Sequence, residues 1–229
     1  MAYDIFLVDA DNTILDFHAS SLLSVRVAFE SFGVEWKDEY GARFTRLNDS
    51  LWEMLERKEI TRERLINERF PRYLQELGFP EIDAVEYNKI FLESLALKPV
   101  YMEGAEAFLA ELKKRGRVYI VTNGTTVIQR SRFEICKLNE KVDGVFVSES
   151  IGFNKPAKGY TDYVLSHIPD FSKARAVWIG DSLSADIKAA NEANIASIWF
   201  NPLKKRGEMG ITPDHEAENF AKILQILGF

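Results

Sequence analysis

The spacing of hydrophobic residues changes twice along the chain and predicts three kinds of segment. A short apolar run at residues 5–8 predicts a fully buried strand. After Asp16, apolar residues recur at helical spacing for roughly 80 residues, and no strand is needed in that block. From about residue 105 onward, helical patterns alternate with short apolar runs. This alternation predicts a parallel sheet with helices on both faces, into which the helical block is inserted between the first two strands.

The helical block contains four amphipathic segments. Thr61 is typical of a residue that caps the start of a helix, and Gly78 is typical of one that ends a helix. We therefore expect four helices here, covering the apolar stripe 22–32 closed by Gly33, the stripe 44–54, the segment 61–78, and 82–97.

The second half of the chain supplies the remaining strands of the predicted α/β fold. The expected strands cover 118–121, 145–147, 176–179 and 197–200. The expected helices include one ended by Gly116, one beginning near Gly159, one containing Asp186 and ending near Asn194, and one over 220–227. The predicted architecture is a Rossmann-like core, formed by residues 1–15 and 99–229, with an all-helical cap at 16–98.

Polar residues follow three of the predicted strands. Because right-handed crossovers bring the carboxyl ends of parallel strands to one edge of the sheet, these residues are expected to meet there. In an extended chain Asp9 and Asp11 lie on the same side, about 7 Å apart. Taken alone, the first two segments are typical of turns, Asp181 with Ser182 is typical of a helix start, and a lone lysine is usually solvated. Their joint occurrence favours a ligand site. The side chains concerned are Asp9, Asp11 and Thr13, then Thr122 and Asn123, then Asp181 and Ser182, with Lys155 in a loop after a further strand.

Composition and charge narrow the functional class. The chain has 229 residues, a net charge of −6 and no block rich in lysine or arginine, which argues against binding to a nucleic-acid polymer. An acidic protein that handles phosphates needs a metal ion and a few well-placed cations. Cys136 is the only cysteine, so no internal disulfide forms and a reducing compartment is favoured. No leader segment and no run of ~18 apolar residues are present, so we expect a cytoplasmic protein without membrane contact.

Together these segments resemble the four motifs of the haloacid dehalogenase-like superfamily of aspartate-nucleophile hydrolases. The resemblance spans the whole chain. The second and third motifs would carry little weight alone, but the set of four in this order is highly specific. The motifs are the DxDxT sequence at 9–13, Thr122 with Asn123 and Gly124, Lys155 with Pro156, and Gly180 with Asp181 and Asp186.

The resemblance implies a role for each motif residue. Asp9 would be the nucleophile, and Asp11 would protonate the leaving group and later activate water. To do so, Asp11 must first carry a proton, which nearby carboxylates would favour. Family dehalogenases lack an acid at this position, so Asp11 favours hydrolysis of a phosphate ester. Thr122, the backbone of Asn123 and Lys155 would bind the phosphate oxygens.

The resemblance also implies a magnesium ion, although oxygen ligands accept Mn²⁺ as well. Asp9, the backbone carbonyl of Asp11 and Asp181 would bind this ion directly. Asp186 would support the metal site from outside, through water or Lys155.

The helical block resembles the cap of the bacterial noncanonical pyrimidine nucleotidases. This implies a nucleoside 5′-monophosphatase that prefers uridine and thymidine nucleotides and whose cap closes over the site. Phe17, Trp36 and Trp52 offer flat faces to a base, and Asn48 or Arg69 can bond to its edge, although aromatic residues on helical stripes also serve as cap core. The similar segments are 9–17, Asn48, 51–52, 60–61, 69–70 and 199–202.

Two alternatives remain open at this point. One is a phosphatase of small sugar or organic-acid phosphates, with the same core and a different pocket. The other is a non-catalytic module that binds a nucleotide or a protein. Neither a monomer nor a homodimer is excluded by the sequence.

Overall fold

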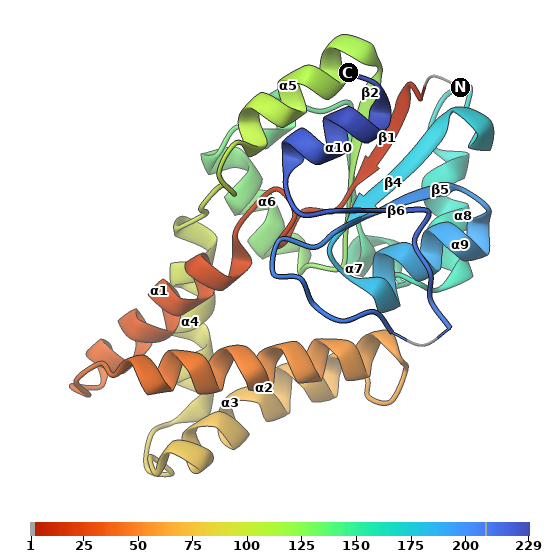
Figure 1. The fold of residues 1–229 in the computed structure, drawn as a ribbon. Coiled ribbons are helices and arrows are strands. Elements are labelled where there is room, and N and C mark those ends of the chain that lie inside the picture. Colours follow the sequence, from red (N-terminus) through yellow and green to blue (C-terminus); the bar gives the residue numbers. More distant parts are fainter. Residues whose placement is uncertain (1–2, 209) are drawn as a thin grey trace. The chain divides into compact units, whose positions relative to one another are not determined.

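The computed structural model describes residues 3–208 and 210–229, so Met1 and Ala2 of the predicted core lie outside the described residues. Its centre is a six-stranded sheet in the order β3-β2-β1-β4-β5-β6, and every pair of neighbouring strands is parallel (Figure 1). The α/β prediction is therefore confirmed. The strands are β1 (Ile5–Val8), β2 (Arg117–Thr122), β3 (Gly144–Val147), β4 (Ala176–Gly180), β5 (Ala196–Phe200) and β6 (His215–Ala217).

Helices connect these strands and also form the insertion. The long helices are α1 (Phe17–Ser31), α2 (Asp38–Glu56), α3 (Arg62–Leu77), α4 (Ala84–Leu97), α5 (Ala105–Arg115), α6 (Thr126–Ile135), α8 (Lys158–Ser166) and α10 (Phe220–Leu227). Shorter helical segments are α7 (Ser148–Ile151), α9 (Lys188–Ala193), the 3₁₀ turns Leu138–Glu140 and Lys173–Arg175, and a π-helical turn Leu183–Ile187. Within the described ranges, none of the helices is long and apolar enough to cross a membrane.

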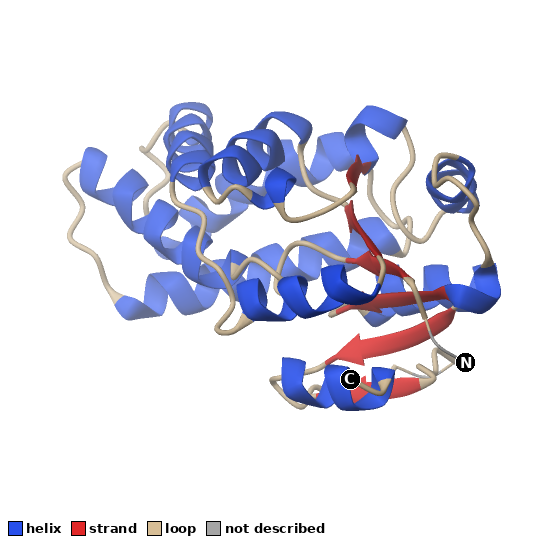
Figure 2. Ribbon diagram, turned by 90° about the horizontal axis from the view of Figure 1, so that it is seen from above, coloured by secondary structure: helices blue, strands red, loops and turns tan. Residues whose placement is uncertain are grey.

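Side chains that alternate along β1 pack on opposite faces of the sheet. Phe6 and Val8 contribute to a core cluster that includes residues of α5, α6 and α10. Ile5 and Leu7 contribute to a second cluster, formed with residues of α8 and α9. Both faces of the sheet are therefore covered by helices, as Figure 2 shows, and β1 is buried throughout.

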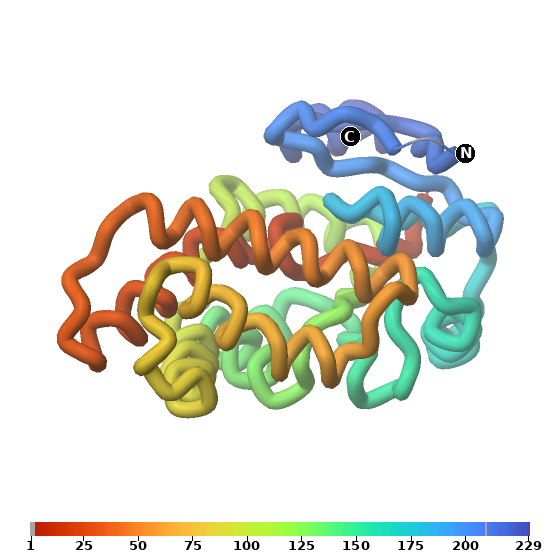
Figure 3. The backbone as a smooth tube through the Cα atoms, turned by 90° about the horizontal axis from the view of Figure 1, so that it is seen from below, coloured from red at the N-terminus to blue at the C-terminus, as the bar shows by residue number. Residues whose placement is uncertain are grey.

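The chain divides into two compact units. One contains the sheet and is made of residues up to Asp16 and from Tyr101 onward, and the other spans Phe17–Val100. The second unit consists of α1 to α4, and its helices α2 and α3 run side by side (Figure 3). Its interior is rich in aromatic rings. For example, Phe70 lies against Tyr87 and Phe91, with 5.0 Å between ring centroids in both pairs.

The local signals for α3 were correct. The Thr61 hydroxyl accepts a hydrogen bond from Arg64 N at 3.2 Å, and Gly78 ends the helix with a φ of 83°. The strand β6 was not predicted because it has three residues, of which two are exposed. The expected helix around Asp186 is also different, because it begins as the π-helical turn and becomes α-helical only at Lys188.

Gly116 provides a test of how tightly β1 and β2 approach each other. A Cβ atom at this position would lie within 2.1 Å of the Asp4 carbonyl oxygen, and backbone cannot move away as a flexible side chain can. We expect Gly116→Ala to lower the free energy of unfolding by about 1–3 kcal/mol, as overpacking does. Gly207→Ala is the control, because a Cβ there would have no atom within 4 Å. Equal denaturation midpoints for the two variants would contradict the prediction.

Candidate active site

The candidate site lies at the carboxyl ends of the three central strands, within the unit that contains the sheet. Asp9 directly follows β1, and its backbone N–H donates to Ile179 of β4 at 2.9 Å. Thr122 is the last residue of β2, and Asp181 directly follows β4. Because β1 pairs with β2 on one side and β4 on the other, the topology brings together the strand ends that the sequence indicated.

Lys155 is the cation at the centre of this edge. Its Nζ lies 2.6 Å from Asp9 Oδ1 and 2.6 Å from Asp186 Oδ1, and donates to the Val121 carbonyl at 2.8 Å. The side chain is buried, with a relative exposure of 2%. Burial works to lower the pKa of Lys155, but the carboxylates of Asp186 and Asp9 outweigh it, so the pKa is raised and the ammonium stays charged.

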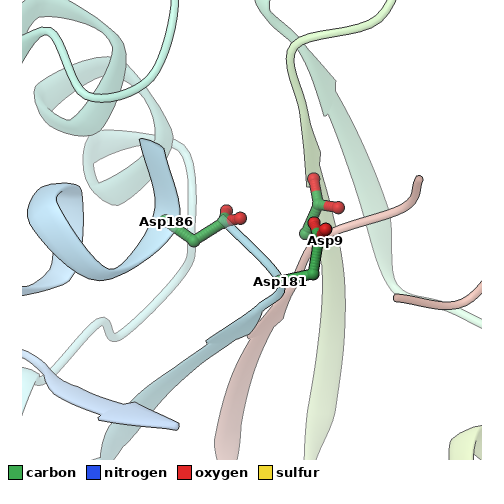
Figure 4. A group of neighbouring side chains, drawn as sticks. All are labelled: Asp9, Asp181 and Asp186. Atoms are coloured by element: carbon green, nitrogen blue, oxygen red, sulfur yellow. The ribbon is translucent and has the colours of Figure 1, made fainter. Parts of the chain in front are cut away.

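Three carboxyl groups gather beside this ammonium. One oxygen from each of Asp9, Asp181 and Asp186 lies within 4.8 Å of the others. Figure 4 shows the side chains converging from the end of β1, the loop after β4 and the turn that follows that loop. A second cation, Lys205 Nζ, lies 3.9 Å from Asp181 Oδ2 on a half-exposed side chain.

The electrostatics of this cluster fit a divalent cation. Burial raises the pKa of Asp9 well above its usual value, and the nearby charges of Asp186 and Asp181 add to the effect, while Lys155 opposes it. Three carboxylates thus face a single buried ammonium, which leaves excess negative charge in a poorly solvated place. A hard cation such as Mg²⁺, which prefers carboxylate oxygens, would offset that excess.

Two tryptophans hold the segments that carry the acidic residues. Trp178 in β4 donates its indole N–H to Asp186 Oδ1 at 3.2 Å, and Trp199 in β5 donates to the Asp181 carbonyl at 2.9 Å. The sequence analysis assigned no role to either indole. Both lie in buried apolar strands, for which the sequence predicts only core packing. The acceptor of an indole N–H is determined by the tertiary structure.

The Asp11 carboxylate is held by two side chains of α6 that the sequence analysis missed. Arg132 Nη1 lies 2.6 Å from Asp11 Oδ1, and Gln129 Nε2 donates to Asp11 Oδ2 at 2.7 Å. Both neighbours are hydrogen-bond donors, whereas the sequence predicts neighbouring carboxylates that would favour a proton on Asp11. The available signal was a polar pair spaced three residues apart, on one face of the helix that begins after the Thr-Asn-Gly turn.

Asn123 connects the second and third motif segments. Its side-chain amide donates to the Lys155 carbonyl at 3.0 Å, and its Oδ1 accepts from the Lys155 backbone N–H at 2.8 Å. This two-way bond fixes the backbone that carries Lys155 beside the strand end that carries Thr122.

The predicted substrate-selecting residues lie in the helical unit. Arg69 is buried, and its guanidinium donates to Asn48 Oδ1 and to Asn88 Oδ1, at 3.2 Å in each case. Trp52 is half-buried, with the Arg62 guanidinium 5.5 Å from its ring centroid, and Phe17 is the first residue of α1. The structure thus joins Asn48 and Arg69 and places Trp52 and Phe17 elsewhere in that unit.

Residues 3–194 match the family described as haloacid dehalogenase-like hydrolase. The chain is a haloacid dehalogenase-like hydrolase. A HAD-hydrolase of Bacillus subtilis, YfnB, is 34% identical over 98% of this chain and 95% of its own length. The pyrimidine 5′-nucleotidase PynA of Streptococcus pneumoniae is 32% identical over 99% of this chain and 96% of its own length.

Solved structures agree with this family. The crystal structure of YfnB from Bacillus subtilis bound to magnesium superposes with a TM-score of 0.94 at 33% identity and covers the whole of both chains. A dehalogenase structure that covers all of this chain and 98% of its own gives a TM-score of 0.77 at 14% identity, which shows a common fold alone. A dehalogenase thus shares this fold, and the local chemistry has to separate the possible activities.

We expect the excess negative charge of the site to appear in the stability of the metal-free protein. Asp9→Asn removes one buried carboxylate, so its metal-free thermal midpoint should equal or exceed that of the wild type. Saturating Mg²⁺ should raise the wild-type unfolding free energy by about 2–3 kcal/mol, and that of Asp9→Asn by clearly less.

Asp162→Asn is the matched control, because Asp162 is exposed and pairs with Lys158 on α8. It should respond to Mg²⁺ as the wild type does. An equal response to Mg²⁺ in Asp9→Asn would contradict a metal site at this carboxylate.

Proposed function

We propose that this hydrolase is a Mg²⁺-dependent phosphatase that cleaves nucleoside 5′-monophosphates, with pyrimidine nucleotides preferred. The observation that carries the proposal is the Asp11 carboxylate, oriented by two donors two residues after the buried Asp9. A halide leaves without a proton, whereas the alkoxide of a phosphate ester needs one. An oriented carboxyl group at Asp11 therefore suits ester hydrolysis. Full-length similarity to a pyrimidine 5′-nucleotidase supports the substrate class.

In the first step, Asp9 attacks phosphorus through a carboxylate oxygen, and the bond from phosphorus to the ester oxygen breaks. The electron pair goes to the ester oxygen, which takes a proton from Asp11 and leaves as the nucleoside 5′-hydroxyl. The phosphoryl group is then bonded to Asp9. The ammonium of Lys155, beside Asp9 Oδ1, holds the attacking carboxylate in place and offsets charge on the phosphoryl oxygens.

In the second step, Asp11, now ionised, takes a proton from a water molecule as that water attacks phosphorus. The bond between the phosphoryl group and Asp9 breaks, which releases inorganic phosphate and restores both carboxyl groups. Thr122 and the backbone N–H of Asn123 bind the phosphoryl oxygens in both steps. A bound Mg²⁺ or Mn²⁺, held by Asp9, Asp181 and the Asp11 carbonyl with support from Asp186, would supply charge neutralisation between nucleophile and phosphate.

We assign selection of the base to residues of the helical unit. Arg69 is buried without a carboxylate among its hydrogen-bond partners, and burial lowers its pKa to about 10. Among the described residues, its Nε has no hydrogen-bond partner. A pyrimidine presents carbonyl oxygens and one N–H, which match the donors of Arg69 and the amides of Asn48 and Asn88.

The function is tested with a panel of phosphate monoesters in the presence and absence of Mg²⁺. We expect phosphate release from dUMP, UMP and dTMP to be much faster than from phosphoglycolate or hexose phosphates. Equal or faster turnover of the sugar and organic-acid phosphates would favour the alternative substrate class. The absence of turnover of every ester would favour a binding module.

Asp9→Asn and Asp11→Asn separate the two carboxyl roles. Asp9→Asn should abolish phosphate release, because an amide cannot form the phosphoryl intermediate. Asp11→Asn should lower kcat by about 10²–10⁴-fold, the usual contribution of general acid–base catalysis, while Mg²⁺ still stabilises the protein. Wild-type turnover in Asp11→Asn would mean that another group supplies the proton.

Arg69→Met tests whether the buried guanidinium selects the base. We expect the KM for dUMP to rise about tenfold or more, because a charged hydrogen bond to the base is lost. The kcat/KM for p-nitrophenyl phosphate, which has no base, should change little. The thermal midpoint should stay close to that of the wild type or rise, because methionine fills the site without an uncompensated charge.

Arg72→Met, on the exposed side of the same helix, is the control and should leave both substrates unaffected. An equal loss with dUMP and with p-nitrophenyl phosphate in Arg69→Met would contradict a role in base selection.

A further inference from the structure

The side-chain amide of Gln129 lies at the centre of a hydrogen-bond network that joins Asp11, Thr122 and Arg132. Its Nε2 donates to Asp11 Oδ2 at 2.7 Å and to Thr122 Oγ1 at 3.0 Å. Its Oε1 accepts from Arg132 Nη1 at 2.8 Å, and the same Nη1 lies 2.6 Å from Asp11 Oδ1. Gln129 and Arg132 are each 1% exposed, so the donor side of these bonds is shielded from water.

Arg132 fixes which way the Gln129 amide faces. A guanidinium can only donate, so the atom of Gln129 that faces Arg132 must be the carbonyl oxygen. The amide nitrogen then faces Asp11 and Thr122, with one N–H available for each. The reversed amide would set a donor against a donor at Arg132 and an acceptor against the Asp11 carboxylate. The hydrogen-bonding chemistry of Arg132 therefore fixes this orientation.

This orientation determines what the Thr122 hydroxyl can do. Its oxygen accepts from Gln129 Nε2 and from the Gly124 backbone N–H, at 3.0 and 3.1 Å. A hydroxyl has two acceptor lone pairs and one proton, so its remaining capacity is to donate. The space for this arrangement exists because residue 124 is glycine, since a Cβ there would lie 2.5 Å from Gln129 Cγ.

We propose that Gln129 and Arg132 are a positioning pair that sets the direction of hydrogen bonding at Thr122 and Asp11. Thr122 is held as a donor toward a phosphoryl oxygen, and Asp11 is held by one donor on each carboxylate oxygen. Each oxygen of Asp11 retains a further lone pair for proton exchange with the leaving group or with water. The inference rests on the proposed phosphatase function, because it assigns how two of its residues are oriented.

The first test compares Arg132→Met and Gln129→Met with Arg130→Met, an exposed arginine of the same helix. We expect the first two variants to lose about 10–100-fold in kcat on dUMP, the range expected for misplaced catalytic groups. Arg130→Met should stay within about twofold of wild type, as a surface change does. Gln129→Met should also raise KM, because Thr122 loses its fixed donor orientation. Arg132→Lys keeps a donor near Gln129 Oε1, so its kcat should lie between those of Arg132→Met and the wild type.

The second test uses the leaving group to locate the defect. p-Nitrophenolate leaves without a proton, so formation of the phosphoryl-enzyme from p-nitrophenyl phosphate does not need Asp11 as an acid, whereas its hydrolysis still needs Asp11 as a base. In Arg132→Met we expect a burst of p-nitrophenolate that approaches one per enzyme, followed by slow turnover. A general loss of structure would slow the burst as well.

The third test asks whether Arg132 acts through Asp11. The rate constant for hydrolysis of the phosphoryl-enzyme should fall in Arg132→Met and in Asp11→Asn, but the double variant should be no slower than Asp11→Asn alone.

A further measurement needs no substrate. The two side-chain amide protons of Gln129 give resonances that are assigned by their loss in Gln129→Met. These protons should exchange slowly with solvent in the wild type and rapidly in Arg132→Met.

Three results would overturn the positioning pair. The first is a kcat for both Arg132→Met and Gln129→Met within twofold of that for Arg130→Met. The second is a loss in the double variant of Arg132→Met and Asp11→Asn that equals the product of the single losses. The third is exchange of the Gln129 amide protons that is equally fast with and without Arg132. If Arg132→Met does not fold, Gln129→Met and Arg132→Lys carry the same comparisons. Failure of wild-type protein to hydrolyse any phosphate monoester would instead refute the proposed function and would be seen before these variants are made.

Discussion

The candidate active site depends on one buried ammonium group. Lys155 contacts Asp9, Asp186 and the Val121 carbonyl near the end of β2, so a single charge joins the ends of β1 and β2 to the turn after β4. Buried charges are costly unless they are paired and hydrogen-bonded, and here each proton of the ammonium has an acceptor. Lys155 holds Asp9 and Asp186 close together, and an oxygen of Asp181 lies within 4.8 Å of both, so the cluster suits a further cation.

The two sides of β1 have different electrostatic character. Toward β4 the side chains are acidic and are held by indole N–H groups and by Lys155, which suits a metal ion. Toward β2 they form a network of donors in which Arg132 and Gln129 surround Asp11 and Thr122. A phosphate ester has an electrophilic phosphorus surrounded by anionic oxygens. The side toward β4 would offer it Asp9 with its charge offset by cations, and the side toward β2 would offer it the oriented groups of Asp11 and Thr122.

Much of this architecture follows from local sequence, and the reasons are specific. The strands that lead to Asp9, Thr122 and Asp181 were predictable because buried parallel strands are short apolar runs. Their shared edge follows from the handedness of the crossovers. The role of Gln129 and Arg132 was not predictable in this way, because Arg132 and Asp11 are 121 residues apart in sequence. A polar pair on a helix is usually solvated, and only the tertiary structure reveals that this one is buried. The strand β6 and the π-helical turn at residues 183–187 were likewise invisible to periodicity.

The tryptophans beside the acidic cluster have a practical consequence. The indoles of Trp178 and Trp199 are bonded to the two segments that bear Asp186 and Asp181, and both rings are buried. Indole emission is sensitive to the polarity and charge around the ring. A rearrangement of those segments is therefore expected to change the intrinsic tryptophan fluorescence. The two indoles thus form an intrinsic optical probe of the acidic cluster, and a Mg²⁺ titration of unlabelled protein should change their emission if the ion binds there.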